Sequence, residues 1–399
     1  MKQFKLTNIL LLTILAFLGV GCSQIQTNYY VANEGNDANQ GTKAKPFQSF
    51  QKGLNAVKPG DTLFVMPGNY PDEEFTINKL HGTADSLIHI FAFDNNKKPL
   101  LMGGMKISHS TYLHVKGFEL TKKHFDMYGK DTHHNIIENF DVHHVEGVQI
   151  AFSMHKLTHD NLILNCDFHH NVLFKGSHCD GLAMWGDKRA DPPDGPYNNK
   201  VMFCRSYFNN DDGFDTWWGG AGNYFEGCWA YGNGKDQDFN DIKGDGNGFK
   251  MGQGKYNYTT VVNSLAWKNR HTGFDENSNQ AGGVTVYNCT AWKNDYNNFD
   301  FWEPPATDKV VNNISFKGNI YLEGADDSNN NWNLGLEATA DDFITLDYSA
   351  NMSPRKPDGS LPDSDFLMLK KDSQFKAIGI DVGLPYNGKA PDLGYYGNK

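Results

Sequence analysis

Short runs of alternating apolar and polar residues recur along the chain, from HVKGFELTK at residues 114–122 to SFKGNIYLE at residues 315–323. β-Branched and aromatic residues are frequent in these runs, and Asn or Gly usually follows them. Alternation with a period of two is typical of short strands, and the Asn or Gly that follows is typical of a turn. The pattern therefore predicts an all-β protein built from many short strands.

One position in each run is equivalent from repeat to repeat, and the spacing varies from 22 residues (Phe118 to Phe140) to 38 (Cys166 to Cys204). Repetition at this period is typical of a solenoid, in which the shortest spacing is a bare coil and longer ones carry loops. Four of these positions are Cys, which fits an inward stack of small side chains, so we expect free thiols. The equivalent residues are Phe118, Phe140, Cys166, Cys204, Cys228, Ser264, Cys289 and Asn319.

A second set of equivalent positions carries charge. The segments NDDGFD (210–215), NGFK (247–250), TGFD (272–275) and NNFD (297–300) align on their Phe residues. Side chains alternate between the two faces of a strand, and neighbouring coils lie about 4.8 Å apart. The alignment predicts an inward stack of Phe214, Phe249, Phe274 and Phe299, and an outward column of Asp215, Lys250, Asp275 and Asp300. The preceding coil, DGLAMW at 180–185, places Asp180 on Asp212.

The two ends differ from the repeats, as solenoid ends must if they are not to polymerise. Residues 47–57, FQSFQKGLNAV, have the apolar spacing of a short helix, which we expect to cap the N-terminal mouth. From about residue 326 the coils become unclear and prolines divide the chain into loops, which we expect to pack along the side. We expect a single domain over residues 22–399.

The N-terminus has the order of an export signal: Lys2 and Lys5, an apolar run from Ile9 to Val20, then Gly21-Cys22. The sequence LGVGC resembles a bacterial lipobox, so residues 1–21 are interpreted as a lipoprotein signal peptide and Cys22 as the acylated residue. An ordinary cleaved signal is the alternative. We expect an exported, lipid-anchored monomer at the outer membrane.

Composition narrows the range of partners. The chain has 36 Lys and Arg against 47 Asp and Glu, and its formal net charge is −11. A protein of this charge is poorly suited to binding phosphate backbones, so nucleic acid is excluded as a partner. The 41 Gly and the 13 % aromatic fraction agree with many tight turns between strands.

Carboxylates from two adjacent coils are predicted to converge on one patch: Asp180, Asp211, Asp212 and Asp215. Four carboxylates this close repel one another unless a cation offsets their charge. All-oxygen ligands with loose geometry suit Ca²⁺ better than Zn²⁺. The alternative is that single Asp residues merely fill turns, but the stacking of a second Asp over DDGFD favours a calcium site.

Lys250 lies one coil beyond Asp215, in the glycine-rich segment GDGNGFKMGQG. It is either an ion-pair partner in the acidic column or a general base, since burial and a nearby cation favour the neutral amine. A divalent cation beside a base suits the removal of a proton next to a carboxylate, which uronic acids offer. We therefore expect β-elimination in a uronate polymer, with an unsaturated sugar as product.

Three further residues are weaker candidates for substrate contact. Arg270 and His271 follow Lys250 by one coil, where they contact a uronate or are merely solvated edge residues. Trp217 falls on the outward face, as do Trp185 and Trp302, and outward aromatic rings can stack on sugars.

These segments resemble polysaccharide lyase family nine, the pectate-lyase-like right-handed parallel β-helices. NDDGFD, GDGNGFK, HTGFDENSN and GGVTVYNCTAWKN carry the resemblance, together with N-terminal YYVANEGNDANQGTKAKPFQSFQKGLNAVKPGDTLFVMPGNY and C-terminal DVGLPYNGKAPDLG. The resemblance implies calcium at Asp180, Asp211, Asp212 and Asp215 and a catalytic base at Lys250. It also implies an acidic plant polysaccharide as substrate, either polygalacturonate or the alternating rhamnose and galacturonate backbone of pectin.

Two other classes of protein are compatible with a solenoid of this kind. A β-helix glycoside hydrolase requires a pair of carboxylates and gives Lys250 no role. A non-catalytic carbohydrate-binding solenoid retains affinity for the polymer without turnover. The sequence leaves open which pectic backbone is cleaved and whether cleavage is internal or terminal.

Overall fold

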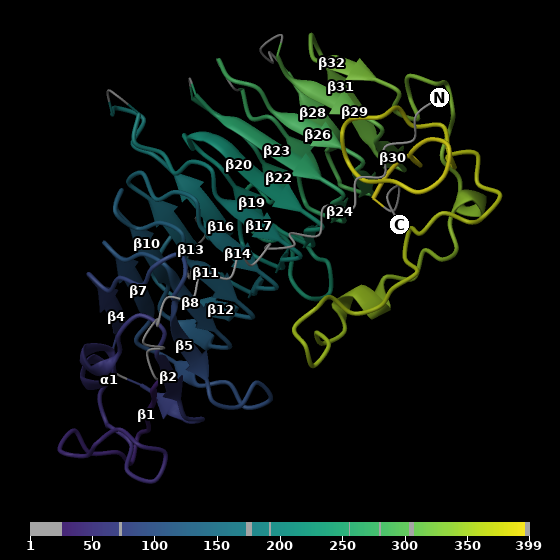
Figure 1. Cartoon of the computed structure of the whole chain (residues 1–399). Coiled ribbons are helices and arrows are strands. Elements are labelled where there is room, and N and C mark those ends of the chain that lie inside the picture. Colours follow the sequence, from purple (N-terminus) through teal and green to yellow (C-terminus); the bar gives the residue numbers. More distant parts are fainter. Residues whose placement is uncertain are drawn as a thin grey trace, which may run out of the picture.

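The computed structural model of the chain describes residues 26–395, except residues 72–73, 173–177, 191–192, 255, 279–280 and 303–306. The predicted signal segment and Cys22 lie outside the described residues. The described strands form three sheets, in which every pairing between strands is parallel. From β2 (Thr62–Val65) to β31 (Asn319–Leu322) the chain visits the three sheets in rotation, one strand in each per coil (Figure 1).

Sheet 1 has twelve strands: β1 (Asn28–Val31), β2, β5 (Ile88–Ala92), β8 (Leu113–Lys116), β11 (Ile136–Glu138), β14 (Leu162–Leu164), β17 (Lys200–Met202), β20 (Ala221–Glu226), β23 (Tyr258–Val262), β26 (Thr285–Tyr287), β29 (Lys309–Val311) and β32 (Asp326–Ser328). Sheet 2 has ten: β3 (Asn69–Tyr70), β6 (Leu100–Leu101), β9 (Glu119–Lys122), β12 (Asp141–Val145), β15 (Asp167–His169), β18 (Arg205–Tyr207), β21 (Trp229–Tyr231), β24 (Leu265–Trp267), β27 (Thr290–Trp292) and β30 (Ile314–Phe316). Sheet 3 has ten: β4 (Phe75–Asn78), β7 (Met105–Ser108), β10 (Phe125–Tyr128), β13 (Ile150–His155), β16 (Asp180–Trp185), β19 (Phe214–Asp215), β22 (Phe249–Lys250), β25 (Phe274–Asp275), β28 (Asn297–Phe301) and β31.

Sheet 3 has the register predicted from the aligned Phe residues. Phe214 pairs with Phe249, Phe249 with Phe274, and Phe274 with Phe299. Their rings stack inside the solenoid with centroids 5.0, 5.0 and 5.1 Å apart. Because the four Phe side chains point inward, the residue after each of them points outward, and the charged column is confirmed.

The residue between sheets 1 and 2 is the repeated inward position, as predicted. The Cys166 thiol accepts the backbone N–H of Phe140 at 3.4 Å, and the Ser264 hydroxyl accepts that of Cys228 at 3.1 Å. The prediction is wrong at the last coil, where Asn313 occupies this position and accepts the N–H of Cys289 at 2.8 Å. Asn319 instead begins β31, because the residues that follow Asn313 already pair with β27.

The predicted capping helix is shorter than its apolar pattern. Helix α1 spans Phe50–Ala56, and the Ser49 side chain caps it by accepting the N–H of Lys52. Phe50 stacks on Phe75 of β4, with ring centroids 4.1 Å apart, so the helix covers the first coil of the core. Figure 1 shows α1 beside β1 and β4 at the N-terminal end of the solenoid.

Beyond β32, the described chain forms loops and two short 3₁₀ helices, Ala340–Asp342 and Ser349–Met352. Apolar residues of this segment, including Phe343, Phe366 and Phe375, pack against the outer face of sheet 2 around Trp267 and Trp292. The segment therefore lies along one side of the solenoid, drawn in yellow-green and yellow in Figure 1. No described residue of this segment lines the pocket beside the charged column of sheet 3.

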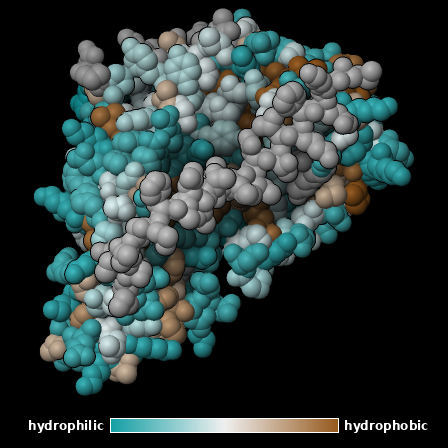
Figure 2. Space-filling view, viewed as in Figure 1, coloured by the Kyte–Doolittle hydropathy of each residue, from teal (hydrophilic) through white to brown (hydrophobic). Residues whose placement is uncertain are grey.

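The face of the molecule shown in Figure 2 is largely hydrophilic outside the grey atoms, and apolar residues appear on it in small separate groups. Among the described residues, no helix is long and apolar enough to span a bilayer.

Candidate active site

The predicted site residues come from three consecutive coils of sheet 3. Asp180 begins β16, Asp215 ends β19, and Lys250 ends β22. Asp211 and Asp212 lie in the turn that precedes β19. Since Asp215 pairs with Lys250 and Leu182 with Phe214, the parallel register brings these coils into contact at one edge of the sheet.

Three of the four predicted metal ligands form a compact, buried carboxylate cluster. One oxygen from each of Asp180, Asp211 and Asp212 lies within 4.8 Å of the others. Backbone amides hold the cluster in place: the Asp212 N–H donates to Asp180 at 3.1 Å, and the N–H of Asp245 donates to Asp211 at 2.7 Å. Backbone N–H groups of neighbouring coils therefore help to fix the positions of the Asp180 and Asp211 carboxylates.

The site is electrostatically costly without a cation. Burial and the negative charges of Asp215, Asp211 and Asp212 raise the pKa of Asp180 well above its usual range. Burial and Asp212 raise the pKa of Asp211 to about 6. Burial also raises the pKa of Asp215 to about 7, to which Asp212 and Asp211 contribute while Lys250 opposes them. These carboxylates are thus placed where like charges destabilise the ionised forms.

This donor set fits a hard divalent cation. Ca²⁺ binds carboxylate oxygens at 2.3–2.6 Å, so oxygens on opposite sides of one ion are about 5 Å apart. The oxygens of Asp180, Asp211 and Asp212 fall within that span. A doubly charged cation would relieve the repulsion that contributes to the raised pKa values of Asp180, Asp211 and Asp215.

Lys250 stands beside this cluster on the next coil. Its Nζ lies 3.0 Å from Oδ2 of Asp212 and 3.9 Å from Oδ2 of Asp215, and its side chain is 16 % exposed. Burial alone lowers the pKa of Lys250, but Asp212, Asp215 and Asp180 outweigh burial and raise it above the ordinary value. The amine is therefore charged as long as those carboxylates are uncompensated.

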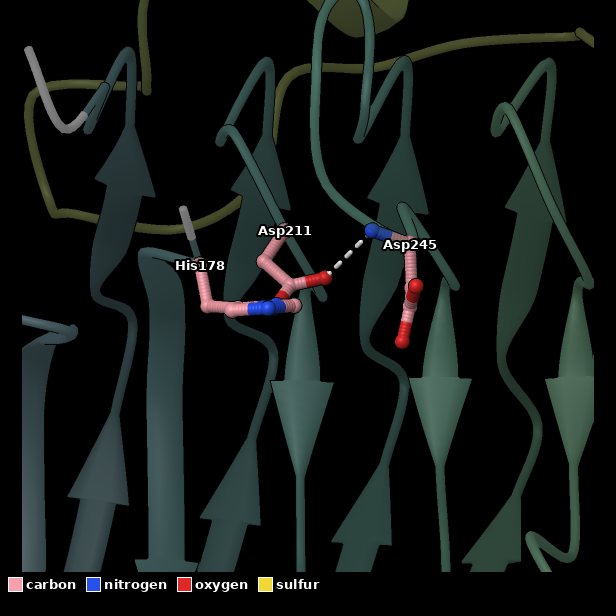
Figure 3. A group of neighbouring side chains, drawn as sticks. All are labelled: His178, Asp211 and Asp245. Carbon is pink, nitrogen blue, oxygen red and sulfur yellow. Dashed lines mark hydrogen bonds and ion pairs between the residues drawn. The ribbon is translucent and has the colours of Figure 1, made fainter. Parts of the chain in front are cut away.

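Two residues that the sequence analysis did not single out complete the surroundings of Asp211. His178 Nδ1 lies 2.5 Å from Asp211 Oδ2, and His178, Asp211 and Asp245 form a second group of closely spaced ligand atoms. Figure 3 shows the three side chains on neighbouring coils, with the Asp245 amide directed at the Asp211 carboxylate. Both residues lie in connections between strands, whose position the coil register does not fix.

Asn247 was also missed, although it lies in the aligned NGFK segment. Its backbone N–H and its Nδ2 both donate to Oδ1 of Asp212, at 2.8 and 2.9 Å. Its own Oδ1 lies 3.0 Å from His271 Nδ1. Asn247 thus holds Asp212 so that the other carboxylate oxygen faces Lys250.

The three weaker candidates for substrate contact, His271, Arg270 and Trp217, have different surroundings. His271 lines the same pocket as Lys250 and stacks on Tyr296 with centroids 4.6 Å apart. Arg270 is not among the described residues that line this pocket, and its Nη1 donates to the carbonyl of Gly244 at 2.5 Å. Trp217 is partly buried, and its indole N–H donates to the Gln253 side chain.

A pocket of about 1020 Å³ opens beside Lys250 along the outer face of sheet 3. It follows the charged column over Asp275 and Asp300 to Tyr321, which pairs with Asp300 on the next coil. Three spacings of about 4.8 Å between successive coils separate Lys250 from Tyr321, so the distance along the groove is about 14 Å. Such a groove accommodates part of an extended polymer.

Comparisons with known proteins agree with this architecture. A family model described as "Pel9A-like, right handed beta helix region" matches residues 29–319. Pectate lyase L of Dickeya dadantii (strain 3937) is 30 % identical over 393 residues, which cover 92 % of this chain and 90 % of that protein. The crystal structure of pectate lyase Pel9A superimposes with a TM-score of 0.81 at 28 % identity, covering 94 % of this chain and 97 % of the other.

A solved structure of a rhamnogalacturonan lyase is also similar, with a TM-score of 0.72 at 26 % identity over 87 % of this chain and 97 % of that one. Fold, site and relatives together define the protein as a polysaccharide lyase of the right-handed parallel β-helix class. The chain belongs to the Pel9A-like family. The predicted resemblance to polysaccharide lyase family nine is thereby confirmed.

Proposed function

We propose that this protein is a calcium-dependent lyase that cleaves uronate-containing pectic polymers by β-elimination, with Lys250 as the general base. The observation that carries this proposal is the position of the Lys250 amine, 3.0 Å from the carboxylate of Asp212, at the head of the pocket. The names of the relatives, pectate lyase and rhamnogalacturonan lyase, support a pectic substrate.

Asp180, Asp211, Asp212 and Asp215 are the residues that would hold the calcium ion. A calcium ion held there would offset the charge of these carboxylates and would polarise a uronate carboxylate, which would make the proton on the adjacent ring carbon more acidic. Lys250 is sensitive to that neutralisation, because Asp212, Asp215 and Asp180 are the groups that raise its pKa. Offsetting their charge lets burial lower the pKa, so that the amine becomes available as a base.

The reaction balances with the groups on this face. The lone pair of the Lys250 amine takes the proton from the ring carbon next to the carboxylate, and the C–H electron pair forms a double bond to the neighbouring ring carbon. The bond from that carbon to the glycosidic oxygen breaks, and the departing oxygen gains a proton from solvent. The products are a new reducing end and an unsaturated uronate, which absorbs in the ultraviolet.

The direct test is to incubate the purified protein with polygalacturonate and with the rhamnose–galacturonate backbone, with Ca²⁺ or with a chelator. We expect ultraviolet-absorbing product with Ca²⁺ and loss of activity with chelator. Lys250→Ala should lower kcat by about 10²–10⁴-fold, the usual contribution of general-base catalysis. Lys309→Ala is the matched control, because Lys309 is exposed on β29 of sheet 1.

Absorbing product that forms equally well with Lys250→Ala would contradict elimination by this residue. Cleavage that yields only saturated reducing ends would show a hydrolase. Polymer binding with no cleavage under any condition would show a carbohydrate-binding solenoid.

We further propose that the chain is an exported lipoprotein, cleaved before Cys22, folded as one domain and acting as a monomer. The order of charged, apolar and small residues over 1–22 supports export and lipid attachment. Mass spectrometry of the protein from membranes of an expressing bacterium should find diacylglycerol on Cys22. The Cys22→Ala variant should lose the lipid and leave the membrane fraction.

A further inference from the structure

The pocket beside Lys250 has an aromatic lining toward the C-terminal end of the solenoid. Tyr296, Trp302 and Tyr321 line it there, and they are 54 %, 45 % and 48 % exposed. The ring of Tyr296 is held by its stacking on His271, and Tyr321 stands in the outward column one coil beyond Asp300. Open aromatic faces gathered along one groove offer the apolar surface that a sugar ring can cover.

Carboxyl side chains line this part of the pocket. Asp275 and Asp300 pair in register and are 9 % and 7 % exposed. The side-chain amide of Asn297 donates to Oδ2 of Asp300 at 2.7 Å, whereas Oδ1 of Asp300 is buried and has no hydrogen-bond partner. Among the described residues that line the pocket, Lys250 and His271 are the only side chains able to carry positive charge. A second uronate here would meet two carboxylates and little to offset its own charge.

We infer that the stretch of the groove formed by Asp275, Asp300, Tyr296, Trp302 and Tyr321 is a subsite for an uncharged sugar ring, next to the uronate at Lys250. This inference rests on the proposed function. The aromatic rings attract a neutral ring, and the carboxylates repel an acidic one, so the same surface both favours one sugar and rejects the other. The preferred polymer then alternates uronate with neutral sugar, and consecutive uronates are the poorer substrate.

The test compares kcat/KM for the alternating rhamnose–galacturonate backbone with that for polygalacturonate, at pH 8.5 and saturating Ca²⁺. We expect the wild-type protein to prefer the alternating polymer at least tenfold. Asp300→Asn keeps the shape of the side chain but removes its charge. It should raise kcat/KM for polygalacturonate and so lower the ratio of the two kcat/KM values at least threefold. Tyr321→Ala should lower kcat/KM for the alternating polymer about threefold to tenfold, mainly by raising KM.

Matched controls separate these effects from general damage. Tyr258→Ala removes an aromatic ring of similar exposure from sheet 1, and Asp372→Asn removes an exposed charge from the C-terminal segment. Both should leave the preference between the polymers unchanged. A wild-type preference for polygalacturonate would overturn the inference, as would an unaltered ratio in both pocket variants. If Asp300→Asn does not fold, Tyr321→Ala still tests the inference. The Tyr321 side chain is half exposed, so its removal should not prevent folding.

Affinity electrophoresis in gels that contain each polymer, with chelator present, measures binding without turnover. Stronger retardation by the alternating polymer, reduced by Tyr321→Ala and not by Tyr258→Ala, supports the subsite even if no unsaturated product forms. That result would reject the proposed elimination alone. Active cleavage of both polymers with no difference in retardation or in kcat/KM would reject the subsite alone.

Discussion

Asp215 and Lys250 stand side by side on neighbouring coils because Phe214 and Phe249, the residues before them, stack inside the solenoid. The ring centroids are 5.0 Å apart, and the two charged side chains project from the opposite face. A parallel solenoid thus converts a repeated apolar position in the sequence into a row of adjacent polar side chains. The chemistry of the site depends on this register.

Loss of one carboxylate from the cluster should weaken calcium binding and leave the fold intact. Asp211→Asn keeps an acceptor for the N–H of Asp245 but removes one negative charge from the ligand set. We expect the half-saturating Ca²⁺ concentration to rise at least about tenfold, because affinity for Ca²⁺ follows the number of charged ligands. Tm measured against Ca²⁺ concentration, without substrate, gives this value.

Asp372→Asn is the control for this titration, since Asp372 is exposed and far along the chain from the cluster. Its Tm should respond to Ca²⁺ as the wild type does. An Asp211→Asn protein whose Tm follows the wild-type titration would show that Asp211 is not a ligand.

The register of the site was predictable, and the loops around it were not. The aligned Phe residues were sufficient to place Asp215, Lys250, Asp275 and Asp300 in one column, because strand alternation and parallel pairing allow little freedom. His178 and Asp245 approach Asp211 from connections of irregular length, where no periodic pattern exists. Apolar spacing alone could not reveal them.

The loop contacts of Arg270 and Trp217 could not be predicted from their positions in the repeat. Each is turned toward a loop: Arg270 donates to the carbonyl of Gly244, and Trp217 donates to Gln253. These partners lie on either side of Lys250 in the glycine-rich segment, whose path the sequence pattern does not specify. The misplaced Asn319 has the same origin, because the short turn after β30 hid the true equivalent, Asn313.

Asp275 should make the protein less stable as the pH rises. Burial, followed by Asp300 and Asp212, raises the pKa of Asp275 to about 7, against 3.8 for the unfolded chain. Between these values the folded state holds the proton more tightly, so the free energy of unfolding falls as pH increases. Asp275→Asn removes the charge and keeps the acceptor for the N–H of Asn277.

We expect Asp275→Asn to raise the free energy of unfolding by roughly 2–4 kcal/mol at pH 8 and to change it little at pH 4. Urea unfolding at both pH values, with Ca²⁺ present to neutralise the neighbouring cluster, measures the difference. Asp372→Asn should show no such pH dependence. Equal effects of Asp275→Asn at the two pH values would refute a raised pKa at this residue.

The buried thiols should be unreactive in the folded protein, and a Cys→Ser substitution in the inward stack should change its stability little. Cys166, Cys179, Cys204, Cys228 and Cys289 are free and buried. Ser264 occupies an equivalent position, where its hydroxyl donates to Val262 at 2.8 Å. Cys204→Ser should therefore change the free energy of unfolding by only about 1 kcal/mol, whereas Cys204→Leu should cost about 1–3 kcal/mol through overpacking.

A thiol reagent added with and without denaturant checks the first part of this prediction. The five cysteines should react only after unfolding, and reducing agent should not alter Tm. Rapid labelling of the native protein at any of the five cysteines would show that the region around it opens, contrary to the prediction.

Asp167 ties the C-terminal segment to sheet 2. Arg205 binds its carboxylate through Nε and Nη2 at 2.8 and 2.6 Å, and Arg355 Nη2 approaches it to 2.8 Å. Arg205 also donates to the carbonyl of Asn351 at 2.9 Å. Burial opposes ionisation of Asp167, but Arg355 and Arg205 outweigh burial and hold its pKa well below the usual range.

Asp167→Ala should destabilise the protein by about 3–5 kcal/mol, because it leaves two buried guanidinium groups without their carboxylate. Arg355→Met should lower the free energy of unfolding by less, since Arg205 still pairs with Asp167. It should, however, make the segment around residues 349–360 accessible to limited proteolysis.

The depressed pKa of Asp167 contributes stability above about pH 4, and that contribution is lost as the pH falls further. The wild-type protein should therefore lose more stability than Asp167→Ala between pH 5 and pH 2. Parallel losses in the two proteins would mean that Asp167 is not held ionised by the two arginines.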